Sequence, residues 1–444
     1  MTDLAQRLRE SWGDPQRLRS VIRAAHPADL AEALEGLPDP ELLRVLEVLG
    51  AEAAGLFEYL PPDRQRRLLR LLPPEVQARI LEGMSRDDAA DLLGALGSEE
   101  AQAYLQRMSS GEAQDVQQLM GYAPESAGGR MSTEVVTVSE SWTAGEALEH
   151  LRRLAPSAET VYYVYVVDAE GRLRGVVGLR DLIVAEPQTP ISAIADRKVV
   201  AVQAEDDQET VAQVFQKYSL LALPVVDRAG RLLGVVTVDD VLDVVQEEAT
   251  EDAYRLTGLS RAAVELEPSP WRRALRRLPW LLTLMVVELL AGSVVGGFEH
   301  ALKTLVVLAF FIPMLNDQAG NMGIQTVVFT VRAVATGRVH RGWYKAFLLR
   351  EVVVGLAAGA LSAGVAAAIG WLWWHDLRLS AVLATTVFTT MNVAALLGVL
   401  IPLGLMWLGR DPAVASGPFI TSLMDVVTVT VYFAVATAMF RLAG

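Results

Sequence analysis

The chain lacks cysteine altogether and contains only five histidines, which do not cluster. The absence of cysteine excludes disulfides and thiolate metal sites. Walker A, nucleophile-elbow and zinc-protease motifs are also missing, so the sequence does not predict an enzyme. The first residues, Met1–Gln6, lack the apolar core of a signal peptide, and we therefore expect the N-terminal part to stay in the cytoplasm.

Basic residues are the minority, since 39 Lys and Arg stand against 53 Asp and Glu and leave a net charge of −14. Such acidity argues against nucleic acid as a partner and favours cations. The charge is unevenly spread: residues 1–270 carry most of it, and residues 278–444 are largely apolar. We therefore expect a multidomain membrane protein, with a soluble half followed by a membrane half.

Residues 1–126 predict an all-α N-domain. Leu, Ala, Glu and Arg dominate, and prolines such as Pro62 and Pro74 stand where short helices would begin. Short amphipathic helices joined by tight turns favour a superhelix of helix hairpins. Asp87, Asp88 and Asp91 follow Ser85 at one predicted helix start, where they either complement the helix dipole or contact a cation.

Residues 127–245 contain an internal duplication with an offset of 59 residues. The segments Val167–Asp181 and Val226–Asp240 match, and each copy predicts a strand, an Asp/Gly turn, a second strand and a helix. An amphipathic helix precedes each copy. This order resembles a pair of cystathionine-β-synthase (CBS) modules, which are α/β units that often dimerise and can bind adenine nucleotides.

The CBS resemblance implies a nucleotide, such as ATP, near Tyr163, Arg180 and Asp181. Arg180 would pair with phosphate and Asp181 with ribose hydroxyls. The alternative is an ordinary Arg–Asp helix cap. The second copy has Asp239 where the first has Arg180, so we expect only one competent cleft.

Residues 240–270 predict an acidic connecting helix, with no basic residue after its start until Arg255. A spacing of 3, 4 and 4 residues puts four acids on one helical stripe: Asp240, Asp243, Glu247 and Glu251. Glu248 and Asp252 lie beside this stripe. The helix either presents a solvated face or forms a cation-controlled switch with acids elsewhere, namely Asp87, Asp91, Asp207 and Glu209.

Residues 271–444 predict an all-α transmembrane domain of five spans, each long enough to cross a bilayer. The spans are about Leu278–Phe298, Leu302–Phe329, Ala346–Trp374, Leu379–Trp407 and Pro412–Phe440. Basic residues flank one side of the bundle: Arg272, Arg273, Arg276, Arg277, Arg332, Arg338, Arg341, Lys345 and Arg410. The positive-inside rule therefore places the soluble half in the cytoplasm and the C-terminus outside.

Asp425 is the only ionisable residue within the last span. A carboxylate at bilayer depth costs roughly 2.5–3.5 kcal/mol, so it is expected either to line a pore or to lock neighbouring helices by a hydrogen bond. Gly417 and Pro418 are expected to loosen this helix, and the string Pro313–Gln325 is expected to interrupt the second span. Glu288 is a further isolated polar group in the first span.

Three pore-lining candidates lie in the second span: Asp317, Asn321 and Gln325. A polar helix-packing seam is the alternative interpretation of these residues. Five spans do not readily enclose a path alone, and a twofold assembly with a pore on its axis is therefore expected.

The order of the segments, with three specific strings, resembles the MgtE magnesium channels and transporters over essentially the whole chain. The strings are Tyr122–Met131, Gly320–Gln325, and Asp411-Pro412 followed by Ser416–Asp425. The resemblance implies a homodimeric, Mg²⁺-gated Mg²⁺ pathway in the inner membrane. It implies that Asp425, with backbone near Gly417 and Thr421, holds a hydrated Mg²⁺ in the pore.

The resemblance also makes the acidic helix a plug that closes the pore through bridging Mg²⁺ ions. The acids it implies are Asp240, Asp243, Glu248, Glu251 and Asp252 on the plug, facing Asp87, Asp91, Asp207, Glu209 and Asp411. Two departures are present: Ala319 stands where the family commonly has glycine, and Asp317 adds an acid. Two alternatives stay open, namely a carrier of Co²⁺ or Zn²⁺ and a membrane-anchored adenylate sensor without transport. The missing cysteine and sparse histidine count against soft metals.

Overall fold

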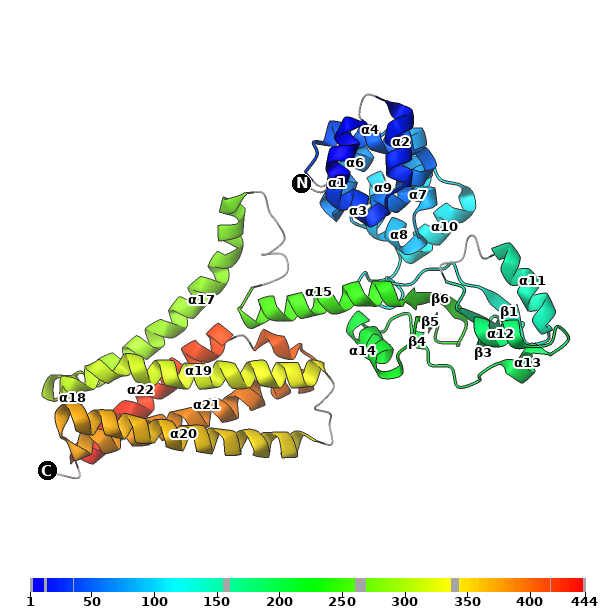
Figure 1. Cartoon of the computed structure of the whole chain (residues 1–444). Helices are drawn as coiled ribbons and strands as arrows, with labels where there is room; N and C mark the ends of the chain where they lie inside the picture. The colour runs from blue at the N-terminus through cyan, green and yellow to red at the C-terminus, as the bar shows by residue number, and fades with distance from the viewer. Residues whose placement is uncertain are drawn as a thin grey trace. The chain divides into compact units, whose positions relative to one another are not determined.

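The computed structural model describes residues 3–11, 14–34, 36–154, 160–259, 269–336, 343–415 and 417–441. The chain divides into two compact units, residues 1–245 and 246–444, which are described separately. Figure 1 colours both units from the N-terminus in blue to the C-terminus in red. The predicted flanking residues Arg338 and Arg341, and Ser416 of the third string, lie outside the described residues.

The first unit begins with short helices, as predicted. They are α1 (Asp3–Glu10), α2 (Pro15–Arg23), α3 (Pro27–Leu34), α4 (Asp39–Leu49), the 3₁₀ turn η1 (Gly50–Glu52), α5 (Ala53–Glu58), α6 (Pro62–Leu71), α7 (Pro74–Gly83), α8 (Arg86–Gly94), α9 (Ser98–Leu105) and α10 (Ser110–Leu119). Proline opens α2, α3, α6 and α7, because its missing N–H and fixed φ suit the first helical position.

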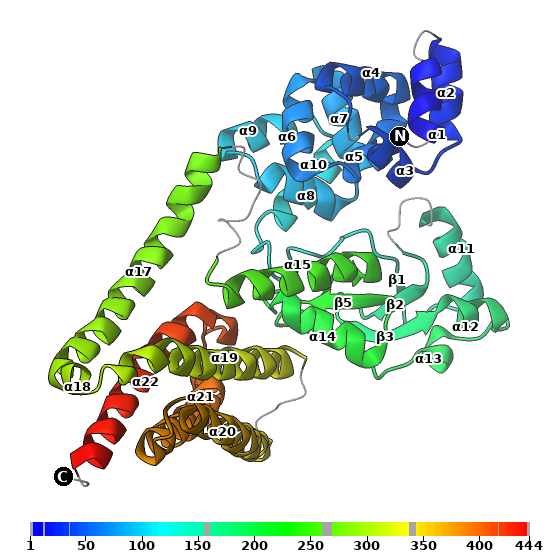
Figure 2. The same cartoon turned by 60° about the vertical axis from the view of Figure 1, so that its left-hand side comes forward.

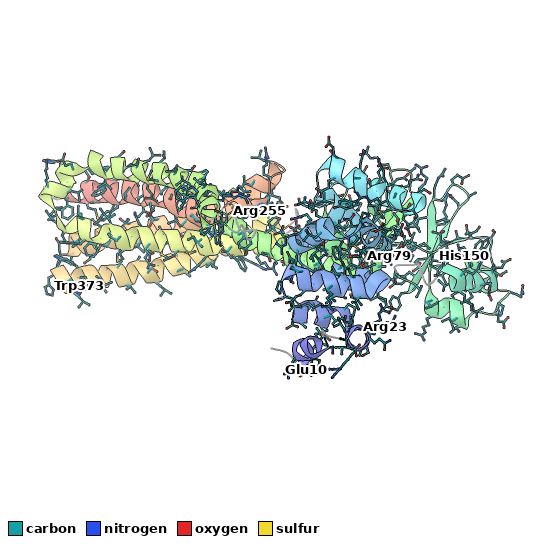
Figure 3. The ribbon with its side chains drawn as sticks, turned by 90° about the horizontal axis from the view of Figure 1, so that it is seen from above. Glu10, Arg23, Arg79, His150, Arg255 and Trp373 are labelled. Carbon is teal, nitrogen blue, oxygen red and sulfur yellow. The ribbon has the colours of Figure 1, made fainter. Side chains whose placement is uncertain are left out.

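Ion pairs join segments of this helical region that are not adjacent in the sequence. Arg23 binds Glu52 at 2.6 Å, and Arg70 binds Glu100 at 2.7 Å (Figure 3 labels Arg23). The partners are 29 and 30 residues apart in the sequence. Because such exposed pairs contribute little energy, the buried leucines that pack between the helices provide most of the stability.

The duplicated segment forms two three-stranded sheets with the same topology. The first copy contains β1 (Thr137–Ser139), α11 (Ala144–Leu154), β2 (Tyr163–Val167), β3 (Leu173–Gly178), α12 (Leu179–Val184) and α13 (Ile191–Ile194). The second contains β4 (Val202–Gln203), α14 (Gln208–Tyr218), β5 (Ala222–Val226), β6 (Leu232–Thr237) and α15 (Val238–Leu256). In each sheet the first pair of strands is parallel and the second antiparallel.

The turns of the two copies meet each other. Gly171 and Gly230 both have positive φ, 77° and 79°, which explains why glycine ends both Asp/Gly turns. The Leu173 amide donates to the Gly230 carbonyl at 2.9 Å, and the Leu232 amide donates to the Gly171 carbonyl at 3.0 Å. Figure 2 shows α11–α13 beside the first sheet and α14 beside the second. The predicted duplication is therefore confirmed, and the copies are paired through equivalent atoms.

The second unit contains the apolar helices. They are α17 (Pro270–Gly297), α18 (Glu299–Thr304), α19 (Val307–Ala335), α20 (Tyr344–Trp374), α21 (Leu377–Trp407), the 3₁₀ turn η3 (Pro412–Val414) and α22 (Gly417–Arg441). Within the described residues, four of them are long and apolar enough to cross a membrane: α17, α20, α21 and α22. α19 has 29 residues but carries the polar string, so its apolar character falls short.

Small residues bring these helices close together. A Cβ on Gly398 of α21 would lie 2.7 Å from Thr326 Cβ of α19, and one on Gly359 of α20 would lie 2.9 Å from Asn392 Nδ2 of α21. Close backbone approach at glycine is the usual way in which helices associate without a hydrophobic driving force. Both views show α19–α22 running side by side (Figures 1 and 2).

Three predicted boundaries are wrong. The string Pro313–Gln325 does not interrupt the second span, because α19 continues through it. Gly417 and Pro418 do not loosen the last span, because they form the first turn of α22, where proline and free N–H groups are tolerated. The acidic helix α15 ends at Leu256 rather than continuing to residue 270, because Gly258 adopts φ 75° and turns the chain away.

Candidate functional sites

Asp425 lies two turns into α22 and is 8% exposed. Its carboxyl makes a side-chain hydrogen bond with Glu288 of α17 and lies within electrostatic reach of Asp317 of α19. Three membrane helices thus bring carboxyls together near one point. Within the described part of the chain, no three acidic or imidazole groups are arranged to hold one metal ion.

The two residues expected to assist Asp425 have defined local roles. Gly417 opens α22, and its carbonyl accepts a hydrogen bond from Thr421 Oγ1 at 3.1 Å. A Cβ on Gly320 of α19 would lie 3.1 Å from the Thr421 methyl group. The Thr421 side chain therefore lies at the contact between α19 and α22.

The candidates on α19 form a stripe. Asp317, Asn321 and Gln325 are spaced four residues apart, which places them on one helical face, and all three are exposed in the single chain. The Asn321 amide donates to Asp317 Oδ2 at 3.0 Å. An exposed polar stripe of this kind would be costly against lipid.

A second group of acids gathers in the first unit, where α8 approaches the start of α15. Burial raises the pKa of Asp88, and Asp239 and Asp243 raise it further. Burial also raises the pKa of Asp240 to about 6, although Thr237 Oγ1 donates to its carboxylate at 2.5 Å. Desolvated acids held close together in this way favour either protons or a cation.

The predicted acids of α8 take different positions within this group. Asp87 is buried at the first turn, and Asp91 forms an ion pair with Arg130 at 3.8 Å. Asp88, which lies between them, is acted on by Asp239 and Asp243 of α15. The sequence alone named Asp88 at this helix start but did not place Asp239 in the group, because which side of a short helix faces another helix depends on packing.

The acids before α14 have a helix-start role. Asp207 is the N-cap residue, and its Oδ1 accepts from the Glu209 amide at 2.9 Å. Glu209 in turn accepts from Gln213 Nε2 at 3.4 Å. Both acids therefore lie at the start of α14, Asp207 as its N-cap and Glu209 in its first turn.

The remaining acids lie at the other end of α15, in the second unit. Arg255 forms ion pairs with both Glu251 and Asp411, and Figure 3 shows it at the end of the helical bundle opposite Trp373. Asp252 is half-buried; burial raises its pKa, while Arg255 and Arg332 oppose the rise. The sequence placed Glu251 and Asp411 in one set of acids, but it did not identify Arg255 as their common partner.

A pocket of about 530 Å³ opens in the first CBS copy. Tyr163 and Arg180 line it, as the sequence predicts, together with Tyr162, Gly178, Leu179, Ile183, Val184 and Leu221. Asp181 stands at its edge, since its Oδ2 lies 3.4 Å from a Cβ placed on Gly178. The walls are mostly apolar with one guanidinium, an arrangement suited to an aromatic ring that carries phosphate.

Three family sequence models match the chain. The MgtE model, described as a divalent cation transporter, matches residues 312–435, and the MgtE intracellular N domain matches residues 25–125. The CBS domain matches twice, at residues 127–187 and 191–247, in agreement with the duplication.

Two curated relatives that match most of the chain have the same name. The chain is 40% identical over 432 residues to the magnesium transporter MgtE of Thermus thermophilus, covering 96% of this chain and 95% of that protein. It is 39% identical to the Enterococcus faecalis magnesium transporter MgtE, covering 74% of this chain and 72% of that protein.

Two solved structures match the first part of the chain. One, described as the cytosolic domain of the Mg²⁺ channel MgtE in complex with ATP, is 44% identical with a TM-score of 0.52, over 54% of this chain and 99% of that one. The other, the soluble part of a magnesium transporter, is 36% identical with a TM-score of 0.53, over 56% and 98%. The relatives are named as transporters, in agreement with the prediction that the chain is not an enzyme, and with these matches the chain belongs to the MgtE family.

Proposed function

We propose that this protein is a Mg²⁺-selective channel or transporter, in which Asp425 holds a largely hydrated Mg²⁺ with help from Gly417 and Thr421. The observation that carries the proposal is the buried position of Asp425 in an apolar helix, beside two further carboxyls. A carboxylate there is costly unless a cation or a proton compensates it. The names of the relatives support Mg²⁺ as that cation.

The pathway lies between two copies of the chain. Its wall is formed by Asp317, Asn321 and Gln325, which are exposed in a single chain. In a twofold dimer these residues would line a water-filled path on the axis. α19 then serves as the fifth span. The bundle lies in the inner membrane, with the N-domain and CBS modules in the cytoplasm and the C-terminus outside, which agrees with the basic residues in the first turns of α17.

Cytoplasmic Mg²⁺ gates this pathway. The domains involved are a superhelical N-domain (1–126), the CBS pair (127–245) and the acidic segment 240–270, in which α15 supplies the plug helix as far as Leu256, followed by the transmembrane domain (271–444). The regulatory ligands are Asp87, Asp91, Asp207, Glu209, Asp240, Asp243, Glu248, Glu251, Asp252 and Asp411. The raised pKa values of Asp88 and Asp240 support this role, because close carboxylates without a cation repel each other. Several weak sites that fill together would make closure steep in Mg²⁺ concentration.

An adenine nucleotide binds the pocket of the first CBS copy and tunes this gating. The ATP complex of the related cytosolic domain supports the assignment, and so does the position of Arg180 on the pocket wall. Arg180 would meet the phosphates, Tyr163 the base or ribose, and Asp181 the ribose hydroxyls.

Mg²⁺ flux into liposomes tests the pore assignment. We expect Asp425→Asn to lower the uptake rate at least about tenfold, because the neutral amide no longer attracts the ion, and tenfold corresponds to about 1.4 kcal/mol. The matched control is Glu299→Gln on α18, which removes an exposed acid of the same unit and should leave uptake unchanged. Normal Mg²⁺ uptake by Asp425→Asn would show that the assignment is wrong.

The same liposomes separate the other candidate functions. The family model is described only as a divalent cation transporter, and Glu288 and Asp317 place more charge near Asp425 than one pore carboxylate supplies. Uptake of Co²⁺ or Zn²⁺ in preference to Mg²⁺ would identify a carrier of those ions. ATP binding without any cation flux would identify an adenylate sensor.

A further inference from the structure

The last turn of α15 lies against the loop before α22 through direct side-chain ion pairs. Arg255 Nη1 pairs with Asp411 Oδ2, and Arg255 Nη2 pairs with Glu251 Oε1. One guanidinium thus bridges an acid of the connecting helix and an acid of the loop that precedes α22. Asp411 is itself held in place, because its Oδ1 accepts from the Ala413 amide at 2.7 Å.

Backbone and apolar contacts support the same junction. A Cβ on Gly417 would lie 3.3 Å from the Leu256 carbonyl oxygen, so the end of α15 approaches the first residue of α22 closely. The Leu256 side chain packs against the apolar cluster of the second unit. These contacts position Arg255, and they do not depend on the charge of a bound ion.

We propose that Arg255 is a positioning residue that acts as a built-in cation and holds the end of α15 on the loop before α22 without Mg²⁺. A guanidinium stays charged at all physiological pH values and bridges two carboxylates with separate nitrogens. Glu251 and Asp411 therefore engage Mg²⁺ only when Arg255 is displaced. The Mg²⁺ dependence of gating then rests on the acids around Asp88 and Asp240, where Asp239 and Asp243 act on Asp88 and Arg130 partly offsets them.

The charges in the two units support this division. In the second unit, Arg255 and Arg332 both act on Asp252, and Arg255 also pairs with two further acids. The negative charges of Asp252, Glu251 and Asp411 are therefore largely compensated. In the first unit, acids act mainly on acids and burial raises their pKa values. The inference rests on the proposed function, because it assigns which proposed regulatory residues answer to Mg²⁺.

A distance measurement tests the role of Arg255 without measuring transport. The chain has no cysteine, so spin labels can be attached to cysteines introduced at the exposed positions Thr257 and Val414, which flank the ion pairs. In the full-length protein with EDTA, we expect one narrow distance that Mg²⁺ leaves unchanged. Arg255→Gln should broaden and lengthen this distance in EDTA, with the detached fraction raised about tenfold. Millimolar Mg²⁺ should restore it, because the ion replaces the guanidinium.

Two variants separate positioning from a general effect on folding. Arg255→Lys keeps the charge but loses the two-armed geometry, so it should give an intermediate distribution. Arg410→Gln removes the exposed arginine next to Asp411 and should behave as wild type. An unchanged narrow distance in Arg255→Gln with EDTA would overturn the proposal, and so would a wild-type distance that shortens only with Mg²⁺. A wild type that takes up no Mg²⁺ in the liposome assay would instead refute the proposed function.

Discussion

Proton competition at Asp240 offers a quantitative test of the acidic group in the first unit. The pKa of Asp240 is raised from 3.8 to about 6, and burial is the main cause. A Mg²⁺ ion binds the ionised carboxylate and competes with the proton. Lowering the pH from about 7.5 to about 5 converts Asp240 from almost fully ionised to roughly nine-tenths protonated, so the Mg²⁺ concentration for half-saturation should rise about tenfold.

The raised pKa of Asp240 also determines how the folding stability changes with pH when Mg²⁺ is absent. The folded chain binds the proton more tightly than the unfolded chain, so stability from this group is greatest below about pH 4 and falls as the pH rises to about 6. The shift from 3.8 to about 6 corresponds to about 3 kcal/mol. Mg²⁺ should recover this loss at neutral pH, because it compensates the carboxylate charge.

The assay is a Mg²⁺ binding titration of the full-length protein by calorimetry at the two pH values. Wild type should show the tenfold shift between the two pH values, whereas Asp240→Asn should bind Mg²⁺ more weakly at pH 7.5 and show a several-fold smaller shift. Asp63→Asn replaces an exposed aspartate of the N-domain and serves as the control. Equal shifts in wild type and Asp240→Asn would refute the reasoning.

Two further predictions concern packing and nucleotide binding. Gly398→Ala should destabilise the bundle by about 1–3 kcal/mol, because the new Cβ would lie 2.7 Å from Thr326 Cβ. Thermal unfolding in detergent measures this change. The control is Gly292→Ala, which should be neutral because a Cβ there would meet open space. An unchanged melting temperature for Gly398→Ala would mean that α19 and α21 separate easily. Arg180→Ala should weaken ATP binding about tenfold, because the phosphate contact is lost. Calorimetry measures the affinity, and Arg152→Ala, which removes an exposed arginine, is the control. Equal affinities in the two variants would place the nucleotide elsewhere.

Local patterns in the sequence were sufficient for the helices, the duplicated sheets and the apolar helices. The matching Asp/Gly turns predicted two copies because glycine is needed where φ is positive, and both Gly171 and Gly230 meet that need. The cost of a charge in an apolar run identified Asp425 before any neighbour was known. These inferences succeed because periodicity, turn chemistry and hydropathy depend on residues close together in the chain.

Boundaries at proline and glycine were harder to predict, because packing can override local propensity. Pro313 and Gly320 suggested an interrupted span, yet α19 continues through both. Neighbouring helices cover this helix closely, and Thr421 packs beside Gly320, so glycine there serves close approach rather than a break. The same residue type ended α15 at Gly258, where the backbone does turn.

The partners of the charged residues were decided only by the tertiary structure. Asp425 meets Glu288 from another helix, Asp88 meets the acids at the start of α15, and Arg255 meets Asp411, 156 residues further along the chain. The sequence by itself determined which residues carry charge and which segments are apolar. It did not determine which charges meet, because that depends on how helices rotate and pack, and packing is a property of the whole fold.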